Sequence, residues 1–373
     1  MKYWMYASFK ERKEDEIRYL KDKGITSLVI GLDKECIEIA SHLGLDVYVC
    51  TGTYSLPKSD SNKYLSVDIN GNRQIWFGSG CPNQSEIRDR NLEKIRDICN
   101  IDGIKGVFLD GARFASPASG LEPFFTCFCD TCRDKALKLG YDFERLKSNV
   151  TRLYRIITLQ KPGIHCFDGL QAPIDMFELV NELPGVFDWI RFRRDCTTEH
   201  IINVSKVIKE SDSELEFGMY IFTPSLSPLV GQSYVALREV VDIFSPMIYR
   251  YYPDVTVPAP LNSELAAFPL TLSKRTGIPE DTLTDFILRF TGLSGGRKLS
   301  LKELARELPV ESLTLETKKA RALIGDKRLV PIIYLNDDRI EESVDSIKIG
   351  RADDLSFYVY REELKDMVER ACR

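Results

Sequence analysis

Residues 101–132 read IDGIKGVFLDGARFASPASGLEPFFTCFCDTC, an apolar strand that ends in an acid and is followed by a cluster of cysteines. Residues 106–109 form a short, nearly continuous apolar run, which is typical of a parallel strand buried on both faces. Asp110 comes directly after this run, and Arg113 follows it. Because ligands bind at the carboxyl ends of strands in α/β sheets and barrels, we expect both side chains to face a site. An aspartate that only caps the next helix is the alternative.

The second half of this stretch carries three thiols within six residues, Cys127, Cys129 and Cys132. Thiolates at this spacing can converge on a tetrahedral zinc ion, which needs a fourth ligand from elsewhere in the chain. Cys81 is the favoured fourth ligand, and His165 and Cys166 are the alternatives. A zinc ion held by four cysteines has no open position, so the predicted role is structural. Three reduced thiols without a metal are the other interpretation.

Strands and helices alternate along the chain, which implies parallel pairing of the strands. Eight strands are predicted, at residues 3–9, 25–30, 45–50, 106–110, 215–222, 241–249, 329–335 and 355–360. The pattern predicts an α/β protein with a (β/α)8 TIM barrel, formed as a single domain by residues 1–373. Residues 133–185 and 251–328 are mainly helical and interrupt the alternation, so they are predicted to be insertions after strands four and six.

The composition, with 43% hydrophobic and 29% charged residues among 373, is that of an ordinary globular protein. A net charge of −5 gives no overall attraction to nucleic acid or to anionic membrane. The chain has neither an apolar stretch of signal-peptide length at its start nor a run long enough to span a bilayer. We therefore expect a cytoplasmic protein, in which the ten cysteines are reduced or metal-bound.

Several motifs resemble those of glycoside-hydrolase-like (β/α)8 barrels, and the resemblance spans most of the chain. They are CPN at 81–83, DGI at 102–104, DGAR at 110–113 and SPMIY at 245–249. The cysteines are similar to those of the β-galactosidases of glycoside hydrolase family 42, which bind a structural zinc. That likeness implies the ligand set Cys81, Cys127, Cys129 and Cys132. The chain departs from that family at strand four, which ends in Leu109-Asp110 and not in Asn-Glu, and at strand seven, which lacks the nucleophilic glutamate.

A glycosidase needs two carboxylates on either side of the bond that it cleaves. Asp110 and Asp337 are the predicted pair, since each follows a predicted barrel strand. Asp338, Asp68 and Glu178 are alternatives for the second position. The predicted substrate-binding residues are an arginine after strand four, aromatic side chains, and the arginine after strand six: Arg113, Tyr6, Trp76, Tyr249 and Arg250.

Two other functions fit parts of the pattern. The tRNA-guanine transglycosylases also combine a barrel with a Cys-x-Cys-x-x-Cys zinc site, but there the cluster lies near the end of the barrel and a downstream histidine completes it. The acidic net charge of this chain also disfavours RNA. The other alternative is a barrel that binds carbohydrate without cleaving it. Our favoured hypothesis is a glycosidase that acts on a carbohydrate or glycoconjugate, with no nucleic acid or membrane partner.

Overall fold

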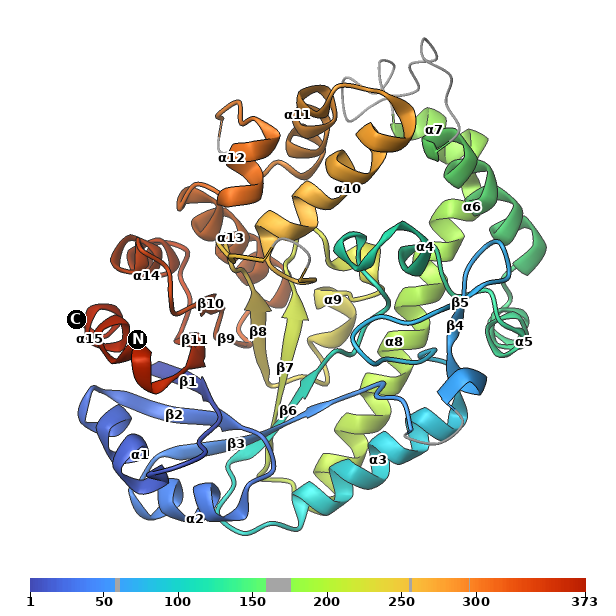
Figure 1. The fold of residues 1–373 in the computed structure, drawn as a ribbon. Helices are drawn as coiled ribbons and strands as arrows, with labels where there is room; N and C mark the ends of the chain where they lie inside the picture. The colour runs from blue at the N-terminus through green and yellow to red at the C-terminus, as the bar shows by residue number, and fades with distance from the viewer. Residues whose placement is uncertain (58–60, 159–175, 255–256, 295) are drawn as a thin grey trace.

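The computed structural model describes residues 1–57, 61–158, 176–254, 257–294 and 296–373, in which parallel strands close into a barrel (Figure 1). The order is β10-β11-β1-β2-β3-β6-β7-β8-β9, and β10 also pairs with β8. The seventh barrel strand is split at Val330 and Pro331 into β9 and β10. The predicted (β/α)8 barrel is confirmed. Its strands are β1 (Tyr3–Ala7), β2 (Ile25–Ile30), β3 (Asp46–Gly52), β6 (Gly106–Asp110), β7 (Glu216–Phe222), β8 (Ile243–Met247), β9 (Arg328–Leu329), β10 (Ile332–Tyr334) and β11 (Leu355–Tyr360).

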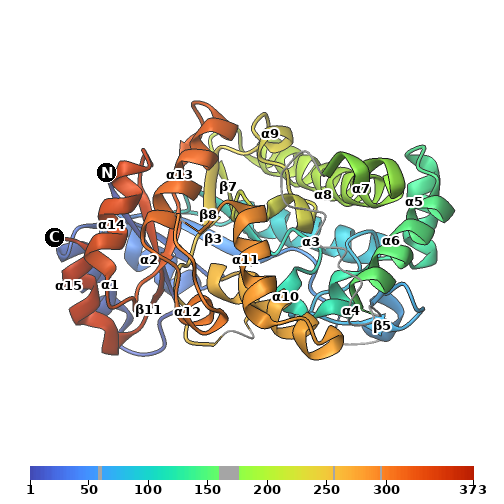
Figure 2. The same cartoon turned by 90° about the horizontal axis from the view of Figure 1, so that it is seen from above.

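Helices surround the barrel because each has one apolar stripe that packs on the strands (Figures 1 and 2). In α1, Ile17 and Leu20 are buried one turn apart, and α2 begins after Asp33, whose side chain accepts a hydrogen bond from the Cys36 N–H at 3.1 Å. These helices are α1 (Lys13–Asp22), α2 (Lys34–His42), α3 (Ser85–Cys99), α8 (Pro184–Ser211), α9 (Tyr234–Leu237), α13 (Glu311–Ile324), α14 (Ile340–Ile349) and α15 (Lys365–Ala371). In the described part of the chain, no helix has the length and apolarity needed to cross a bilayer.

Further short elements lie on the connections between strands. The connection from β3 to α3 carries η1 (Ser61–Tyr64) and the antiparallel pair β4 (Ser66–Val67) and β5 (Arg73–Gln74). After β6 come η2 (Pro117–Ser119), α4 (Leu121–Phe124), α5 (Asp130–Lys138), α6 (Phe143–Thr158) and α7 (Met176–Glu182). The later connections carry η4 (Ser227–Val230), α10 (Leu261–Thr276), α11 (Glu280–Thr291), α12 (Leu301–Arg306) and η5 (Glu362–Leu364). The division into one domain with insertions at 133–185 and 251–328 stays a prediction.

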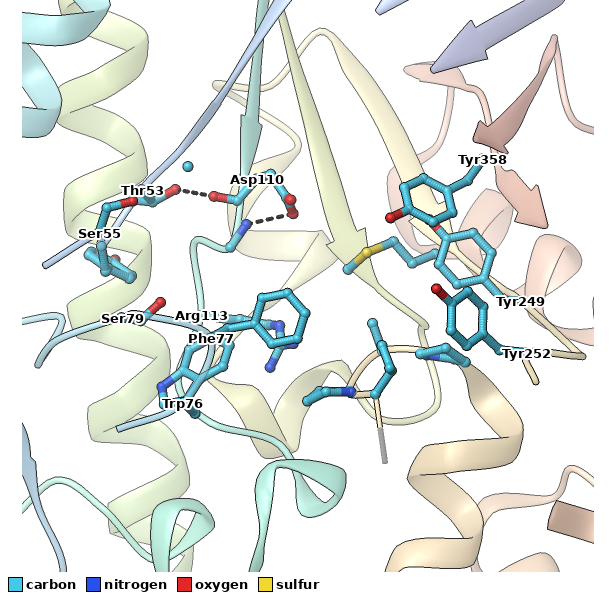
Figure 3. A pocket seen from close by; sticks show the side chains of 18 residues that line it. Thr53, Ser55, Trp76, Phe77, Ser79, Asp110, Arg113, Tyr249, Tyr252 and Tyr358 are labelled. Atoms are coloured by element: carbon cyan, nitrogen blue, oxygen red, sulfur yellow. Dashed lines mark hydrogen bonds between the residues drawn. The ribbon is translucent and has the colours of Figure 1, made fainter. Parts of the chain in front are cut away.

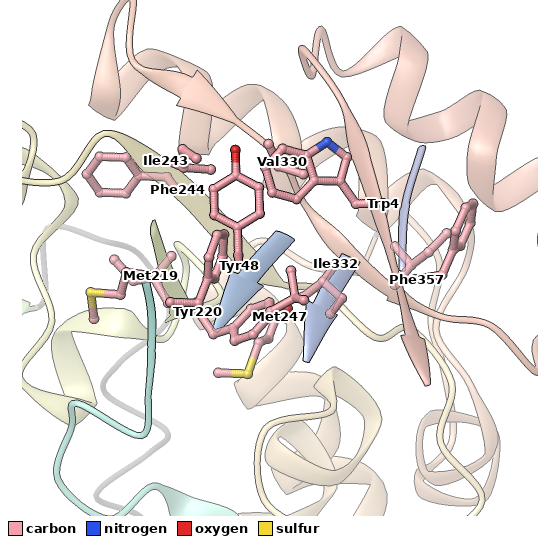
Figure 4. Packing of buried hydrophobic residues seen from close by; sticks show 14 of the residues in the cluster. Trp4, Tyr48, Met219, Tyr220, Ile243, Phe244, Met247, Val330, Ile332 and Phe357 are labelled. Atoms are coloured by element: carbon pink, nitrogen blue, oxygen red, sulfur yellow. The ribbon is translucent and has the colours of Figure 1, made fainter. Parts of the chain in front are cut away.

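The interior of the barrel is filled by large side chains (Figure 4). Trp4 stacks on Tyr48 with ring centroids 4.7 Å apart, and Phe108 meets Tyr48 edge-on at 5.5 Å. A second apolar cluster joins α4, α6 and α8, where Phe125 and Trp189 stack at 5.8 Å. The long helix α8 supplies residues to both clusters and therefore connects the barrel to the helices that follow β6.

The tight packing of the barrel interior predicts a strong effect for a single added methyl group at Gly218. A Cβ there would lie 2.1 Å from Cε2 of the Phe108 ring, far inside van der Waals contact. We expect Gly218→Ala to lower the free energy of unfolding by at least about 1–3 kcal/mol, because overpacking displaces neighbouring side chains. Urea denaturation measures the loss. Gly31→Ala is the control, since a Cβ at Gly31 meets nothing within 4 Å; equal stability of the two variants would contradict the prediction.

Candidate active site

A pocket of about 190 Å³ lies at the carboxyl ends of the barrel strands (Figure 3). Residues from the ends of β3, β6 and β8 line it, namely Gly52, Asp110 and Met247, as does Tyr358 from β11. This is the face on which (β/α)8 enzymes carry their active sites. The volume is below the range of about 300–1,000 Å³ that is usual for drug-sized ligands, so a small ligand such as a single sugar residue fits it best.

Asp110 is held in a defined position at the end of β6. Gly52 of β3 pairs with it, and both the N–H and the hydroxyl of Thr53 donate to its carbonyl oxygen, at 2.9 and 2.6 Å. The N–H of Gly111 donates to Oδ1 of its side chain at 2.7 Å, and the positive φ of 66° at Gly111 turns the chain there. No described residue makes a hydrogen bond to Oδ2. That oxygen is therefore the one able to meet a ligand.

The environment of Asp110 shifts the pKa of its carboxyl upwards. The side chain is half-buried, and burial raises the pKa of its carboxyl above the ordinary value, although the Gly111 N–H and the Arg113 guanidinium act in the opposite direction. Because Oδ1 already accepts the Gly111 N–H, the proton belongs on Oδ2. A carboxyl of this kind can donate a proton to a bound ligand.

Arg113 lies on the wall opposite the tyrosines (Figure 3) and is only 5% exposed. Its guanidinium lies 4.4 Å from the centre of the Trp76 ring and 4.8 Å from that of Phe222. Nη1 donates to the carbonyl of Phe114 at 3.2 Å. Burial lowers the pKa of Arg113, and the negative charges of Glu264 and Asp110 oppose that change. An arginine remains a cation throughout.

Three tyrosines form the other wall, Tyr249, Tyr252 and Tyr358 (Figure 3). The rings of Tyr249 and Tyr358 lie 5.4 Å apart. Burial raises the pKa of the Tyr249 phenol well above its ordinary value, and Tyr358 and Asp110 add to this. The phenol is therefore neutral and can donate a hydrogen bond. Tyr6 packs behind this wall, 5.4 Å from the Tyr358 ring, and is not among the residues that line the pocket.

Two predicted site residues, Asp337 and Arg250, are not brought to the pocket. They are paired with each other: Nε of Arg250 donates to Oδ2 of Asp337 at 2.8 Å, and Nη2 contacts Oδ1. Ser343 also donates to Asp337 at 2.9 Å, and Glu307 accepts from Nη1 of Arg250 at 2.6 Å. Asp337 is 4% exposed. These partners occupy both oxygens of its carboxylate. Asp337 and Arg250 therefore form a structural ion pair between the connection after β8 and the connection after β10.

The ion pair predicts that Asp337→Asn acts on stability. Asparagine leaves the buried Arg250 with the partly exposed Glu307 as its remaining carboxylate partner, so we expect a loss of up to about 3–5 kcal/mol in the free energy of unfolding. Chemical denaturation measures it. The neighbouring Asp338→Asn is a matched control because Asp338 is exposed. An Asp337→Asn variant with unchanged stability would show that Glu307 alone is sufficient as the counter-ion of Arg250.

Two other candidates for the second carboxylate, Asp68 and Asp338, also lie outside the pocket lining. Asp68 is buried and accepts hydrogen bonds from the N–H groups of Asn70 and Asn72, both at 2.9 Å, and from Gln74 at 2.8 Å. It stabilises the turn between β4 and β5. The side chain of Glu178 is outside the described part of the chain. Among the described residues that line the pocket, Asp110 is therefore the only carboxylate.

The four cysteines Cys81, Cys127, Cys129 and Cys132 lie together, with all sulfur atoms within 4.8 Å of one another. Sγ of Cys81 is 3.4 Å from that of Cys132 and 3.7 Å from that of Cys129. Amide groups surround the sulfurs: the Asn83 side chain lies 3.2 Å from Cys132, and the Val67 N–H donates to Cys127 at 3.3 Å. The alternative fourth ligands, His165 and Cys166, lie outside the described residues. Four clustered sulfurs can hold a metal ion.

Sequence reasoning missed several residues of the pocket. Thr53, Ser55 and Ser79 supply hydroxyl groups, and residues 257–260 close one side. Glu264 in α10 was also missed. It is buried and accepts hydrogen bonds from Ser116 at 2.7 Å, Ala118 at 3.0 Å and Ala259 at 2.8 Å, which joins two loops around the pocket. A glutamate in a helix is usually exposed, so no sequence signal marks Glu264 as a residue near the pocket. Tyr252 has such a signal, because it belongs to the Tyr-Arg-Tyr-Tyr run after a predicted strand.

No protein-family model matches the sequence, and no curated relative matches it. The fold is similar to that of a β-galactosidase from the psychrophilic Marinomonas ef1, with a TM-score of 0.59 and 10% identity over 100% of this chain. The chain spans 59% of the length of that protein. It is also similar to the PgaB (BpsB) glycoside hydrolase domain from Bordetella bronchiseptica, with a TM-score of 0.57 and 9% identity over 100% of this chain and 99% of the other. The catalytic domain of a β-amylase from Paenibacillus polymyxa matches with a TM-score of 0.54 and 10% identity over 100% of this chain and 94% of that domain. At these identities the likeness shows the fold alone.

Proposed function

We propose that this chain hydrolyses a glycosidic bond and that Asp110 is the proton donor. The observation that carries the proposal is the half-buried carboxyl of Asp110, with its pKa raised and Oδ2 free of protein hydrogen bonds among the described residues, in a pocket at the carboxyl ends of barrel strands. Aromatic rings and hydroxyl groups around it are suited to a sugar, because rings pack on the apolar face of a sugar and hydroxyls exchange hydrogen bonds. The three similar structures described above are glycoside-cleaving enzymes by name, which agrees with this class.

In the proposed reaction, Oδ2 of Asp110 gives its proton to the glycosidic oxygen while the bond from that oxygen to the anomeric carbon breaks. Water then adds to the anomeric carbon, and the proton that it loses returns through solvent to the Asp110 carboxylate, which restores the acid. The second carboxylate of the usual pair is not found among the described residues that line the pocket. Asp337, the predicted partner, is engaged by Arg250. We therefore assign only the proton donor, and we propose that Trp76, Tyr249 and Arg113 bind the substrate.

A second candidate function is a barrel that binds carbohydrate without cleaving it. This alternative is favoured by the presence of only one carboxylate among the described residues that line the pocket. Hydrolysis of a panel of 4-nitrophenyl glycosides by the purified chain separates the two functions. Release of nitrophenol that depends on Asp110 supports the hydrolase. Sugar binding that persists after removal of Asp110, without release from any glycoside of the panel, would favour the binding protein.

We further propose that Cys81, Cys127, Cys129 and Cys132 bind a structural zinc ion. Zinc bound to thiolates at about 2.3 Å in a tetrahedron places the sulfurs about 3.8 Å apart, and the separations of 3.4 and 3.7 Å are close to that value. Four protein sulfurs leave no open position for a substrate. The bound ion would join the connection before α3 to the start of α5. Elemental analysis of protein purified without added metal distinguishes zinc from iron, which prefers similar ligands.

A further inference from the structure

Three arginines are buried among the described residues, Arg113, Arg193 and Arg250. They differ in the carboxylates and hydrogen-bond acceptors that surround the guanidinium. Arg250 has two carboxylate partners, Asp337 and Glu307. Arg193 has none, but its Nη1 and Nη2 donate to the carbonyls of Leu229 at 2.6 Å and Phe124 at 2.8 Å. Nε of Arg193 has no partner among the described residues, but this atom is sealed from solvent and Arg193 does not line the pocket, so it cannot meet a ligand there.

Arg113 is different because most of its donors are unused. Within the described part of the chain it makes no ion pair, and its only hydrogen bond is that from Nη1 to Phe114. Nε and Nη2 are not sealed from solvent, and the side chain lines the pocket. The rings of Trp76 and Phe222 pack against the guanidinium. The carboxylates of Glu264 and Asp110 act on this buried cation from beyond ion-pair distance, so the cost of its desolvation is only partly offset, and an anionic ligand would offset more of it.

We propose that the pocket takes an anionic glycoside and that Arg113 binds the negatively charged group of the sugar. The substrate class rests on the proposed function, whereas the binding of an anion by Arg113 does not. A guanidinium presents parallel N–H donors that match the two oxygens of a carboxylate, as in a uronic acid. A sulfate ester offers the same chemistry in tetrahedral form. Arg113 lies across the pocket from the tyrosines (Figure 3). A sugar in the pocket can therefore direct its charged group to Arg113 while its ring faces the tyrosines.

The test measures binding of methyl glucuronide, methyl glucoside and the 6-sulfate of methyl glucoside, in both anomers, by calorimetry. The chain with Asp110→Asn is used, so that no turnover disturbs the titration. We expect the glucuronide to bind at least tenfold more tightly than the glucoside at low salt, with the preference weakened by added salt. The sulfate shows whether a planar or a tetrahedral anion is preferred. If the uncharged glucoside binds as tightly as the glucuronide, or more tightly, the proposal is overturned. This first test leaves Arg113 unsubstituted.

Substitutions at Arg113 give the second test. We expect Arg113→Gln to remove the preference for the charged glycoside and Arg113→Lys to keep part of it, because lysine keeps the charge but not the fork of donors. Arg193→Lys is a matched control, since Arg193 is also buried between aromatic rings but does not line the pocket. A preference that survives in Arg113→Gln would overturn the assignment.

The two proposals fail separately. A preference for the glucuronide that depends on Arg113, without hydrolysis of any glycoside, supports the anion site and rejects the hydrolase. Hydrolysis of uncharged glycosides that depends on Asp110, without a preference for charged ones, supports the hydrolase and rejects the anion site.

Discussion

We expect Asp110→Asn to lower kcat for any glycoside that this chain hydrolyses by about 10²–10⁴-fold, the usual contribution of a general acid. Asparagine has nearly the same shape, and its Oδ1 can still accept the hydrogen bond from Gly111. It has no proton to give to the leaving oxygen. KM should change much less than kcat, because Trp76, Tyr249 and Arg113 stay in place.

The pH dependence gives an independent check on the role of Asp110. A proton donor is active in its protonated form, so kcat/KM should fall as the pH rises through the raised pKa of Asp110. Glycosides with a good leaving group, such as 4-nitrophenol, need less protonation and should lose less activity in Asp110→Asn than alkyl glycosides. Full activity of Asp110→Asn on an alkyl glycoside would reject the assignment.

The same substitution should also affect stability, with a sign that follows from the pKa. The ordinary pKa of the carboxyl is 3.8, and burial raises it in the folded chain. Below pH 3.8 the carboxyl is protonated in both states and ionisation costs nothing. As the pH rises through the folded pKa, the unmodified chain loses stability, whereas Asp110→Asn does not. Thermal unfolding at several pH values should therefore show Asp110→Asn becoming relatively more stable towards neutral pH.

Loss of the metal should have the largest effect on stability. We expect Cys132→Ser to bind no zinc and to lose at least about 5 kcal/mol of unfolding free energy, since structural zinc contributes about 10–16 kcal/mol in zinc-finger peptides. Activity should fall as well. Cys81 follows the loop that carries Trp76 and Ser79, and those side chains line the pocket. Without the ion, this wall loses its attachment to α5.

Cys99→Ser is the matched control, because Cys99 is a partly buried cysteine on α3 outside the cluster. It should retain the metal and the stability of the unmodified chain. Incubation with a chelator should reproduce the loss seen in Cys132→Ser and should leave Cys132→Ser itself unchanged. Purified protein that contains no metal, yet unfolds at the same denaturant concentration after addition of zinc, would contradict the structural role.

The barrel was predictable because its elements follow strong local patterns. The helix at Ser85–Cys99 repeats apolar residues at helical spacing, and the structure places a helix over that same range. The clustering of the three nearby cysteines with Cys81 also follows from a pattern, since their spacing is uncommon unless a metal needs it. The split of strand seven at Val330-Pro331 has a signal as well, because proline cannot donate to a neighbouring strand.

The pairing of side chains within the site was not predictable in the same way. Both Asp110 and Asp337 were predicted to follow barrel strands, but Asp110 is the last residue of β6 and Asp337 lies beyond the end of β10, and only Asp110 lines the pocket. The difference is Arg250, which comes from another connection and engages Asp337. Such a long-range pair leaves no local trace in the sequence. Tyr358 was missed for a related reason, because an aromatic residue within a strand is usual and its place on the pocket depends on barrel closure.

The closure of the barrel has a consequence for how the chain is synthesised. The first strand, β1, pairs with β11, and the Lys2 N–H donates to Asp354 at 2.8 Å across 352 positions of the chain. A ribosome that adds about 5–20 residues per second needs roughly 18–70 s to cover that distance. Throughout this interval one edge of β1 has no partner. A nascent chain is therefore open to pairing with other chains, and to binding by chaperones, until its last strand emerges.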